Sequence, residues 1–530
     1  MQNIYLQKKT HNKTVKRNSK DKVMSKVLER NSSDYDLNIR YIIKGGFWLY
    51  SATVVQSIAG FLYWFILSAI GGLNVLGYTS TIVSLSVLIA GLLSLGVDFS
   101  VQKFIGKSLG NRDNDSLRLY FWTSALIFLG IYMAFSTILL FLGLANINLG
   151  NIAPKMLILT SLLLLLNYSL IFHGVLIALI RTDLLLLSTI IGSVLRFIVG
   201  IPLVIHGWGW IGATLGYACS PLVMIITGTL YTLKRIGTKI AFSLAKAKEV
   251  LHAGFAVWFP KAIFIVGQWS SVVVVFSFLG ASETGRYYIA FAISTVVLMA
   301  STSMIKLLLP VLSSMSDGRK RIGWKVLKLS LALSTPLMFI LIAYPTVPLS
   351  ILGREYMLAS DILRLLIVAT IPLAISNTVV NLVFSYGMYT KVLKIGLCQN
   401  IPRLILYIVL VRMMSGLGVA ISYLIGSITG LLSSLKVASD VGFKIAWNDI
   451  GKILAAPLVV STVAYIFPPS LWPILSLTII LVSLISYIKL NVLDKYELKA
   501  IVTALLPRII AVKLNSIIDK LVDIFAETES

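Results

Sequence analysis

Among the positive side chains inside long apolar segments of the sequence, four are placed where they could bind an anion, while Arg364 lies near the end of its segment, close enough to the membrane interface to reach it. Arg196 and Arg403 lie near the middle of two segments, Lys261 about two turns into a third, and Lys306 toward the end of a fourth. A charge in a membrane core is costly unless it is paired, and the planar fork of Arg binds phosphate oxygens bidentately. We therefore predict that these four residues bind an anionic headgroup. The alternative is a structural role, and Lys306 could also extend to the membrane interface.

Asp98 is the clear carboxylate within an apolar segment. It could pair with Lys103, five residues further on, or with a cation from the second half of the chain. It could also carry the proton or sodium ion of a coupled transport cycle. We favour the charge pair. Two cysteines in separate apolar segments suggest no disulfide and no metal site, and we predict no cofactor beyond such a coupling ion.

The segments that position these residues have the composition of membrane-spanning helices. Of 530 residues, 57% are hydrophobic and 13% are charged, which excludes an ordinary soluble domain. A spanning helix needs roughly 20 apolar residues. We therefore predict an all-α polytopic membrane protein with about fourteen transmembrane helices. The expected spans are about 46–70, 79–102, 119–144, 156–180, 184–205, 211–233, 253–279, 287–311, 327–351, 362–386, 392–411, 417–436, 451–467 and 471–489.

The formal charge of +25 could indicate nucleic-acid binding, but the distribution of Lys and Arg argues against it. Basic residues gather before the first span and in every second connection, such as 103–118 and 234–248. The positive-inside rule makes these connections and both termini cytoplasmic, and the basic loops are expected to contact membrane lipids. We predict a plasma-membrane protein with no nucleic-acid partner. The polar leader, residues 1–44, is expected to be largely disordered.

The chain repeats itself. Because each copy holds an even number of predicted spans, the two copies have the same orientation, which gives a parallel repeat of two six-helix bundles plus an extra helix pair. Such repeats are common in secondary transporters, whose halves rock around a site at their interface. The recurring residues are Gly46 and Gly254, Gly72 and Gly280, and Gly77 and Gly285, each pair 208 residues apart, and Arg196 and Arg403, 207 apart.

These observations divide the chain into six parts. The last part carries apolar residues at helical spacing within 497–525, which predicts an amphipathic helix in the inner membrane interface. The expected parts are a basic cytoplasmic leader (1–44), an N-terminal six-helix bundle (45–236), a cytoplasmic linker (237–252), a C-terminal six-helix bundle (253–440), the extra transmembrane pair (441–490) and a cytoplasmic amphipathic tail (491–530).

Short motifs at matching places in both halves add a family resemblance. The segment 69–78, AIGGLNVLGY, and its counterpart 278–287, FLGASETGRY, resemble the first loop of the polysaccharide flippase branch of the multidrug/oligosaccharidyl-lipid/polysaccharide exporter superfamily. Leu95 to Asp98, Gly212 to Thr214 and Gly418 to Ala420 resemble the starts or ends of later helices of that family. The sequence departs from the family in its first span, which has Gln56 but no Lys or Arg.

The resemblance implies a flippase that moves a lipid-linked oligosaccharide, on a polyprenyl or dolichyl phosphate or diphosphate carrier, from the cytoplasmic to the outer leaflet by alternating access. It would serve polysaccharide biosynthesis or protein glycosylation, with glycan-assembly enzymes as candidate partners. Amide side chains in the spans could then bind sugar hydroxyls, or hydrogen-bond between helices instead. These amides are Gln56, Asn377, Asn381, Gln399 and Asn400.

Three other functions remain open. A proton- or sodium-coupled multidrug antiporter of the same fold would need acids in the membrane core, which are scarce here. A polytopic glycosyltransferase or polymerase would need a sizeable extramembrane loop, and all predicted outer loops are short, so we do not expect an enzyme. A scaffold for glycan assembly is the third alternative. The segment 207–212, GWGWIG, matches a dinucleotide pattern, but no soluble strand precedes it.

Overall fold

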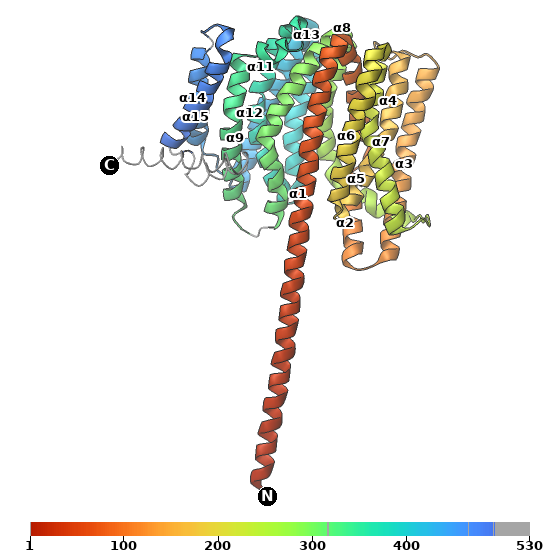
Figure 1. The fold of residues 1–530 in the computed structure, drawn as a ribbon, viewed down its shortest axis with the longest axis vertical. Coiled ribbons are helices and arrows are strands. Elements are labelled where there is room, and N and C mark those ends of the chain that lie inside the picture. Colours follow the sequence, from red (N-terminus) through yellow and green to blue (C-terminus); the bar gives the residue numbers. More distant parts are fainter. Residues whose placement is uncertain (1, 315–316, 465, 491, 493–530) are drawn as a thin grey trace, which may run out of the picture.

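The chain folds into helices that run side by side (Figure 1) in the computed structural model, which describes residues 2–314, 317–464, 466–490 and 492. Apart from an isolated bridge between Leu149 and Ile152, the regular structure of these residues is helical, which confirms the all-α class. The helices are α1 (Gln2–Leu93), α2 (Val97–Gly110), α3 (Asn114–Leu144), α4 (Pro154–Leu166), α5 (Ser169–Ala178), α6 (Thr182–Leu203), η1 (Val204–Trp208), α7 (Gly209–Ile236), α8 (Leu244–Ser314), α9 (Arg319–Ala343), α10 (Thr346–Ser350), η2 (Arg354–Ala359), α11 (Ser360–Val368), α12 (Thr370–Ser385), α13 (Tyr389–Val441), α14 (Trp447–Ala464), η3 (Pro469–Leu471) and α15 (Trp472–Lys489).

Within the described residues, nine helical stretches are long and apolar enough to cross a membrane, so this is a multi-pass membrane protein. Four of them are much longer than the roughly 20 residues of one crossing, and each has the length of two crossings. The expected count of fourteen spans stays a prediction. The four long stretches are Gly45–Leu93, Thr182–Ile236, Val257–Met299 and Tyr389–Val441, with 49, 55, 43 and 53 residues.

Each long stretch contains a backbone break, and the breaks recur with the sequence repeat. Gly72 and Gly280 share a positive φ (70° and 80°) and an extended ψ (−174° and −172°). Gly207 (φ 88°) and Ser415 (φ 53°) mark the other two breaks and are also 208 residues apart. Glycine reaches positive φ without the steric cost of a Cβ. The repeat in the sequence is therefore also a repeat in backbone geometry.

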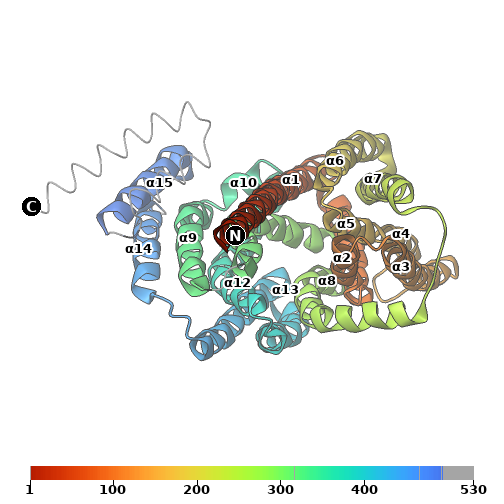
Figure 2. The ribbon, with the colours of Figure 1, turned by 90° about the horizontal axis from the view of Figure 1, so that it is seen from below.

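The two halves meet along α1 and α8. Figure 2 shows α2 to α7 on one side and α9 to α15 on the other, with α1 and α8 between them. Near the breaks, a Cβ built on Gly77 would lie 1.9 Å from the carbonyl oxygen of Ala281, and one on Gly285 would lie 2.2 Å from that of Leu73. These two contacts are related by the 208-residue repeat. The glycines thus allow the helices of the two halves to touch backbone to backbone.

A second close contact lies at the other end of the crossing. A Cβ on Gly96 would lie 2.2 Å from the carbonyl oxygen of Gly254. Next to it, the Ser100 hydroxyl donates a hydrogen bond to the carbonyl oxygen of Val250 at 2.7 Å. We call this second contact the linker-side seam, because it lies where the connection between the halves enters α8, and we call the contact at Gly77 and Gly285 the break-side seam.

The leader at the start of the chain is helical, whereas residues 493–530 at its end lie outside the described part of the structure. Helix α1 begins at Gln2 and extends away from the bundle (Figure 1), so the leader that we expected to be largely disordered has a helical backbone. Residues 1–44 contain neither Pro nor Gly, which are the strongest helix breakers. At the other end, α14 and α15 pack on each other and on α9. The amphipathic helix predicted at 497–525 lies outside the described residues.

Candidate functional site

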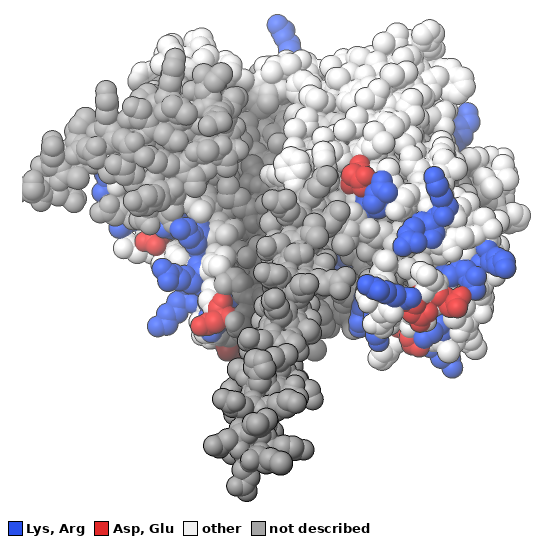
Figure 3. All heavy atoms as spheres, turned by 60° about the horizontal axis from the view of Figure 1, so that its bottom comes forward, with Lys and Arg blue, Asp and Glu red and all other residues white. Residues whose placement is uncertain are grey.

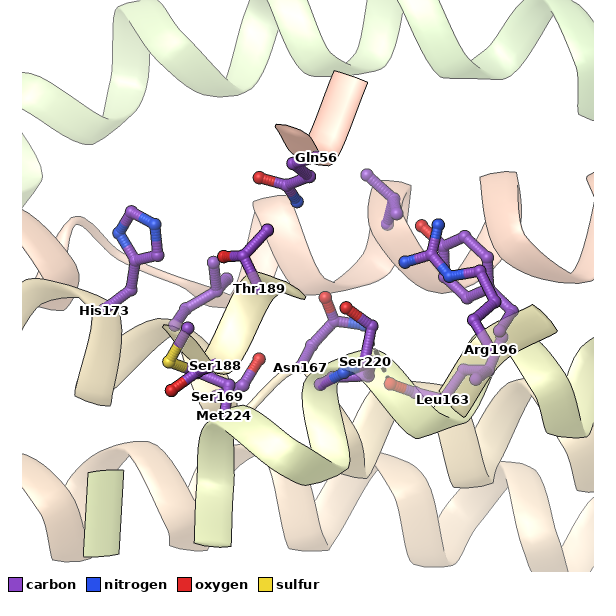
Figure 4. A pocket seen from close by; sticks show the side chains of 14 residues that line it. Gln56, Leu163, Asn167, Ser169, His173, Ser188, Thr189, Arg196, Ser220 and Met224 are labelled. Atoms are coloured by element: carbon purple, nitrogen blue, oxygen red, sulfur yellow. Dashed lines mark hydrogen bonds between the residues drawn. The ribbon is translucent and has the colours of Figure 1, made fainter. Parts of the chain in front are cut away.

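A cavity of about 160 Å³ lies inside the first half, between α1, α4, α5, α6 and α7 (Figure 4). Arg196 and Gln56, two of the predicted site residues, both line it. Figure 4 shows His173 and Arg196 at opposite ends, with Gln56 and Thr189 between them. The polar side chains of the lining are Gln56, Asn167, Ser169, His173, Ser188, Thr189, Arg196, Tyr217 and Ser220.

Sequence reasoning missed most of this lining, because single hydroxyl residues are ordinary in membrane helices. One signal was available on α6. Thr189 and Arg196 are seven residues apart, two helical turns, and therefore share a face. That face was polar within an otherwise apolar helix. The partners that α1, α5 and α7 contribute could not be paired with it from spacing alone.

Arg196 is buried, with 5% of its surface exposed. Its guanidinium carbon lies 4.8 Å from the ring centroid of Tyr217 and 5.6 Å from that of Tyr63. Within the described residues its nitrogens donate no hydrogen bond, and its Nε is buried without an acceptor. Because Arg stays protonated in proteins, this is a buried charge that aromatic rings stabilise but that no acceptor satisfies.

Arg403, the repeat equivalent of Arg196, is 2% exposed and hydrogen-bonded through both terminal nitrogens inside the second half, while its Nε, like that of Arg196, is buried without an acceptor. Its Nη1 donates to Asn400 Oδ1 at 3.2 Å. Its Nη2 donates to Ser427 Oγ at 2.9 Å and to the carbonyl oxygen of Tyr423 at 3.3 Å. The Tyr423 ring centroid lies 4.0 Å from the guanidinium carbon. These contacts occupy both terminal nitrogens of Arg403, which could otherwise bind an anion.

The difference between the two arginines follows from residues at equivalent positions. Tyr217 and Tyr423 correspond, and each lies over its own arginine. At the same 206-residue shift, Ser427 corresponds to Pro221, which has no hydroxyl and lines the cavity. The first half therefore keeps the aromatic partner of its arginine but lacks the hydroxyl that binds Arg403.

Asp98 pairs with Lys261 and not with Lys103. Lys261 Nζ lies 2.9 Å from Asp98 Oδ2, and the pair joins α8 to α2 at the linker-side seam. Of the two partners considered for Asp98, Lys103 does not form the pair, because at about 3.6 residues per turn positions five apart lie about 140° apart around the helix. Lys103 is exposed, and its Nζ lies 5.6 Å from the ring centroid of Phe104. The alternative, a cation from the second half, is what the structure shows.

The remaining predicted residues lie elsewhere. On α12, Asn381 Nδ2 donates to the carbonyl oxygen of Asn377 at 2.8 Å, within one helix turn. Gln399 and Asn400 are buried in α13, on the helix of Arg403. Lys306 lies in α8, and its side chain is outside the described part of the structure. The structure thus separates the predicted residues into several places and does not gather them into one site.

Comparison with known families gives one match. A family model described as polysaccharide biosynthesis protein matches residues 42–316 of the chain. No curated protein of significantly similar sequence was found.

Several solved structures share the fold. The lipid II flippase MurJ, in an inward closed conformation, is 19% identical with a TM-score of 0.63, over 83% of this chain and 97% of that one. An inward-facing multidrug resistance MATE family transporter of the MOP superfamily is 14% identical with a TM-score of 0.55, over 72% and 95% of the two chains. A MOP superfamily transporter from Pyrococcus furiosus, described as having a binding pocket of reverse polarity, is 15% identical with a TM-score of 0.51, over 76% and 95%. At these identities the likeness concerns the fold.

Proposed function

Because this chain belongs to the polysaccharide biosynthesis protein family, we propose that it is a flippase for a lipid-linked oligosaccharide. It moves this cargo, on a polyprenyl or dolichyl phosphate or diphosphate carrier, from the cytoplasmic to the outer leaflet of the plasma membrane. The product feeds polysaccharide biosynthesis or protein glycosylation, and glycan-assembly enzymes supply and consume the cargo.

The observation that carries this proposal is the sign of the interior charge. Among the described residues, Arg196 and Arg403 are the charged side chains that are buried, and no Asp or Glu is buried. A transporter lowers the barrier for a charged cargo with groups of the opposite sign, because burying an unpaired charge is costly. Interior cations suit a phosphate-bearing lipid, whereas a multidrug antiporter for cations would need interior acids. Asp98, the acid such an antiporter would use, is engaged by Lys261.

The two seams support alternating access. We assign the face that carries most Lys and Arg, shown in Figure 3, to the cytoplasm by the positive-inside rule. The linker-side seam then closes the cytoplasmic end, and the break-side seam closes the outer end. Both rest on glycine backbone contacts, which can separate without pulling interlocked side chains apart. Opening one seam while the other stays closed exposes the interior to one side at a time.

Lys261 is the cation that the cargo meets first. Its side chain is 52% exposed although it is paired with Asp98. Because half of the Lys261 side chain is accessible whereas only 19% of the Asp98 side chain is, a carrier phosphate can reach the ammonium and compete with Asp98 for it. The exchange would loosen the linker-side seam as the cargo binds. Arg403, by contrast, holds the second half together, and Lys306 stays a candidate headgroup contact.

The test is translocation of a fluorescent lipid-diphosphate oligosaccharide in proteoliposomes, with an ion gradient present. We expect protein-dependent translocation by the wild type and roughly tenfold slower translocation by Lys261→Gln, the equivalent of about 1.4 kcal/mol. Lys155→Gln, at an exposed lysine at the start of α4, is the control and should match the wild type. No translocation by the wild type would reject the flippase in favour of an antiporter or a scaffold.

A further inference from the structure

We propose that the cavity of the first half is a binding site for a single phosphate-class oxyanion, held by Arg196. The phosphate can be free in solution or can be part of the lipid carrier. The carrier case rests on the proposed function. The free-phosphate case does not, because inorganic phosphate can bind whether or not the protein moves a lipid.

Arg196 lacks hydrogen-bond acceptors within the described part of the protein. A guanidinium has five N–H donors in a fixed fork, and here none of them reaches an acceptor among the described residues, although the side chain is 95% buried. A ring face stabilises the charge but accepts no full hydrogen bond. Buried charges in proteins are paired or hydrogen-bonded. The acceptor for Arg196 must therefore come from outside the protein fold.

The cavity presents hydrogen-bond donors from several sides. Arg196 lines it from α6, Gln56 from α1 and Ser220 from α7, so donors reach the space from three helices (Figure 4). Donors from several directions suit a tetrahedral oxyanion, whose oxygens point to different sides, and Arg can contact two of them at once. His173 adds a second nitrogen group at the far end. No carboxylate lines the cavity to compete for Arg196.

The cavity is small enough to select a small anion. Sites that enclose drug-sized ligands have volumes of about 300–1,000 Å³, whereas this cavity has about 160 Å³. A phosphate with a few waters fits, but an oligosaccharide does not. If the ligand is the carrier phosphate, the sugar must lie outside the cavity, next to the exposed Gln56 on α1.

The second half of the chain holds an internal comparison for Arg196. Arg403 has the same aromatic partner and the same place in the repeat, but Asn400, Ser427 and the Tyr423 carbonyl already occupy it. The fold therefore supplies acceptors to both terminal nitrogens of Arg403, and among the described residues it supplies none to those of Arg196. In the first half the arginine is therefore left to bind a ligand, whereas in the second half the arginine is hydrogen-bonded to other groups of the protein.

The experiment measures binding to the full chain in nanodiscs of phosphatidylcholine, which carries no net charge. Inorganic phosphate and farnesyl phosphate, a short prenyl phosphate, are titrated separately by calorimetry. We expect saturable binding of at least one probe. Arg196→Gln should weaken it roughly ten- to hundredfold, because hydrogen bonds to a charged group are worth about 1.5–3 kcal/mol. Arg403→Gln is the matched control and should leave the dissociation constant unchanged.

A second variant guards against misfolding of the first. Gln56 is exposed, so Gln56→Leu should fold normally and weaken binding roughly three- to tenfold through the loss of one donor. Tighter binding of farnesyl phosphate than of inorganic phosphate would assign the cavity to the carrier, and the reverse order would assign it to free phosphate.

Three results would overturn the inference: no saturable binding of either probe, binding that survives both Arg196→Gln and Gln56→Leu, or equally tight binding of chloride. If the wild type binds phosphate but does not translocate the lipid-linked oligosaccharide, only the proposed function is contradicted. If the wild type translocates the lipid-linked oligosaccharide but binds neither phosphate probe, only the present inference is contradicted.

Discussion

Lys261 Nζ lies 2.9 Å from Asp98 Oδ2 and ties the two halves of the protein together across 163 positions of sequence. The pair stands beside the close contact of Gly96 with Gly254. Asp98 is mostly covered, and its second oxygen, Oδ1, is buried without a hydrogen-bond donor. The linker-side seam therefore combines one half-exposed charge pair, the glycine contact and the hydrogen bond from Ser100 to the Val250 carbonyl oxygen.

The first prediction concerns the energy of this pair. Asp98→Asn and Lys261→Gln, made singly and together, form a double-mutant cycle on thermal unfolding in detergent. We expect a coupling free energy of about 0.2–1 kcal/mol, because Lys261 is half exposed. The control is a second cycle with Lys103→Gln and Asp98→Asn, in which the change in unfolding free energy of the double variant should equal the sum of the two single changes. Additivity of the Lys261 pair together with coupling to Lys103 would contradict the pairing seen in the structure.

The second prediction separates the two buried arginines by stability. Arg403→Ala removes three hydrogen bonds and leaves the Asn400 and Ser427 acceptors without their donor, so it should lower the unfolding free energy by at least about 2 kcal/mol. Arg196→Ala removes a charge that no acceptor satisfies, so it should change stability by less than about 1 kcal/mol. Thermal unfolding of both variants in phosphate-free detergent solution checks this order. The reverse order would mean that Arg196 is the structural residue.

The third prediction concerns the break-side seam. In Gly77→Ala the new methyl group would lie 1.9 Å from the carbonyl oxygen of Ala281, so the two halves must separate there. We expect a loss of about 1–3 kcal/mol in unfolding free energy and slower translocation. Gly130→Ala is the control, because a Cβ at Gly130 in α3 meets nothing within 4 Å. It should be neutral or stabilising by up to about 1 kcal/mol. Equal effects of the two variants would contradict the close contact.

The fourth prediction concerns the pH dependence of the connection between the halves. Tyr120 on α3 donates a hydrogen bond to Glu249, and Lys246 Nζ donates to Glu249 Oε1 at 3.1 Å. These hydrogen bonds, from Tyr120 first and then Lys246, lower the pKa of Glu249 below its ordinary value of 4.5. A lowered carboxyl pKa stabilises the folded contact above pH 4.5, and that contribution is lost as the pH falls through the lowered pKa.

Hydrogen exchange of the segment 237–250, corrected for the intrinsic pH dependence of exchange, measures this contact. We expect exchange to rise as the pH drops below about 4.5 and Glu249→Gln to show raised exchange already at pH 7. Asp115→Asn, whose carboxylate bonds to Arg118 near the same end of α3, is the control and should behave as the wild type. Wild-type exchange that does not change between pH 3 and pH 6 would disprove the role of Glu249.

Much of the fold could be read from local sequence. Hydropathy is a property of each segment by itself, so the membrane class and the helical class followed from composition and run length. The repeat was visible as matching glycines 208 residues apart, and Gly72 and Gly280 proved to be equivalent backbone breaks. The burial of Arg196 and Arg403 was also expected, since both stand near the middle of apolar runs.

The partners of the charged residues were decided by tertiary structure alone. The sequence placed Lys103 and Lys261 equally well for Asp98, and packing of α2 against α8 chose Lys261. The sequence also presented Arg196 and Arg403 as equivalents, but the fold surrounds Arg403 with acceptors and leaves Arg196 beside a cavity. A hydrogen bond or an ion pair needs two groups within a few ångströms. In a helical bundle that distance depends on how helices far apart in the chain cross and rotate, which no local pattern encodes.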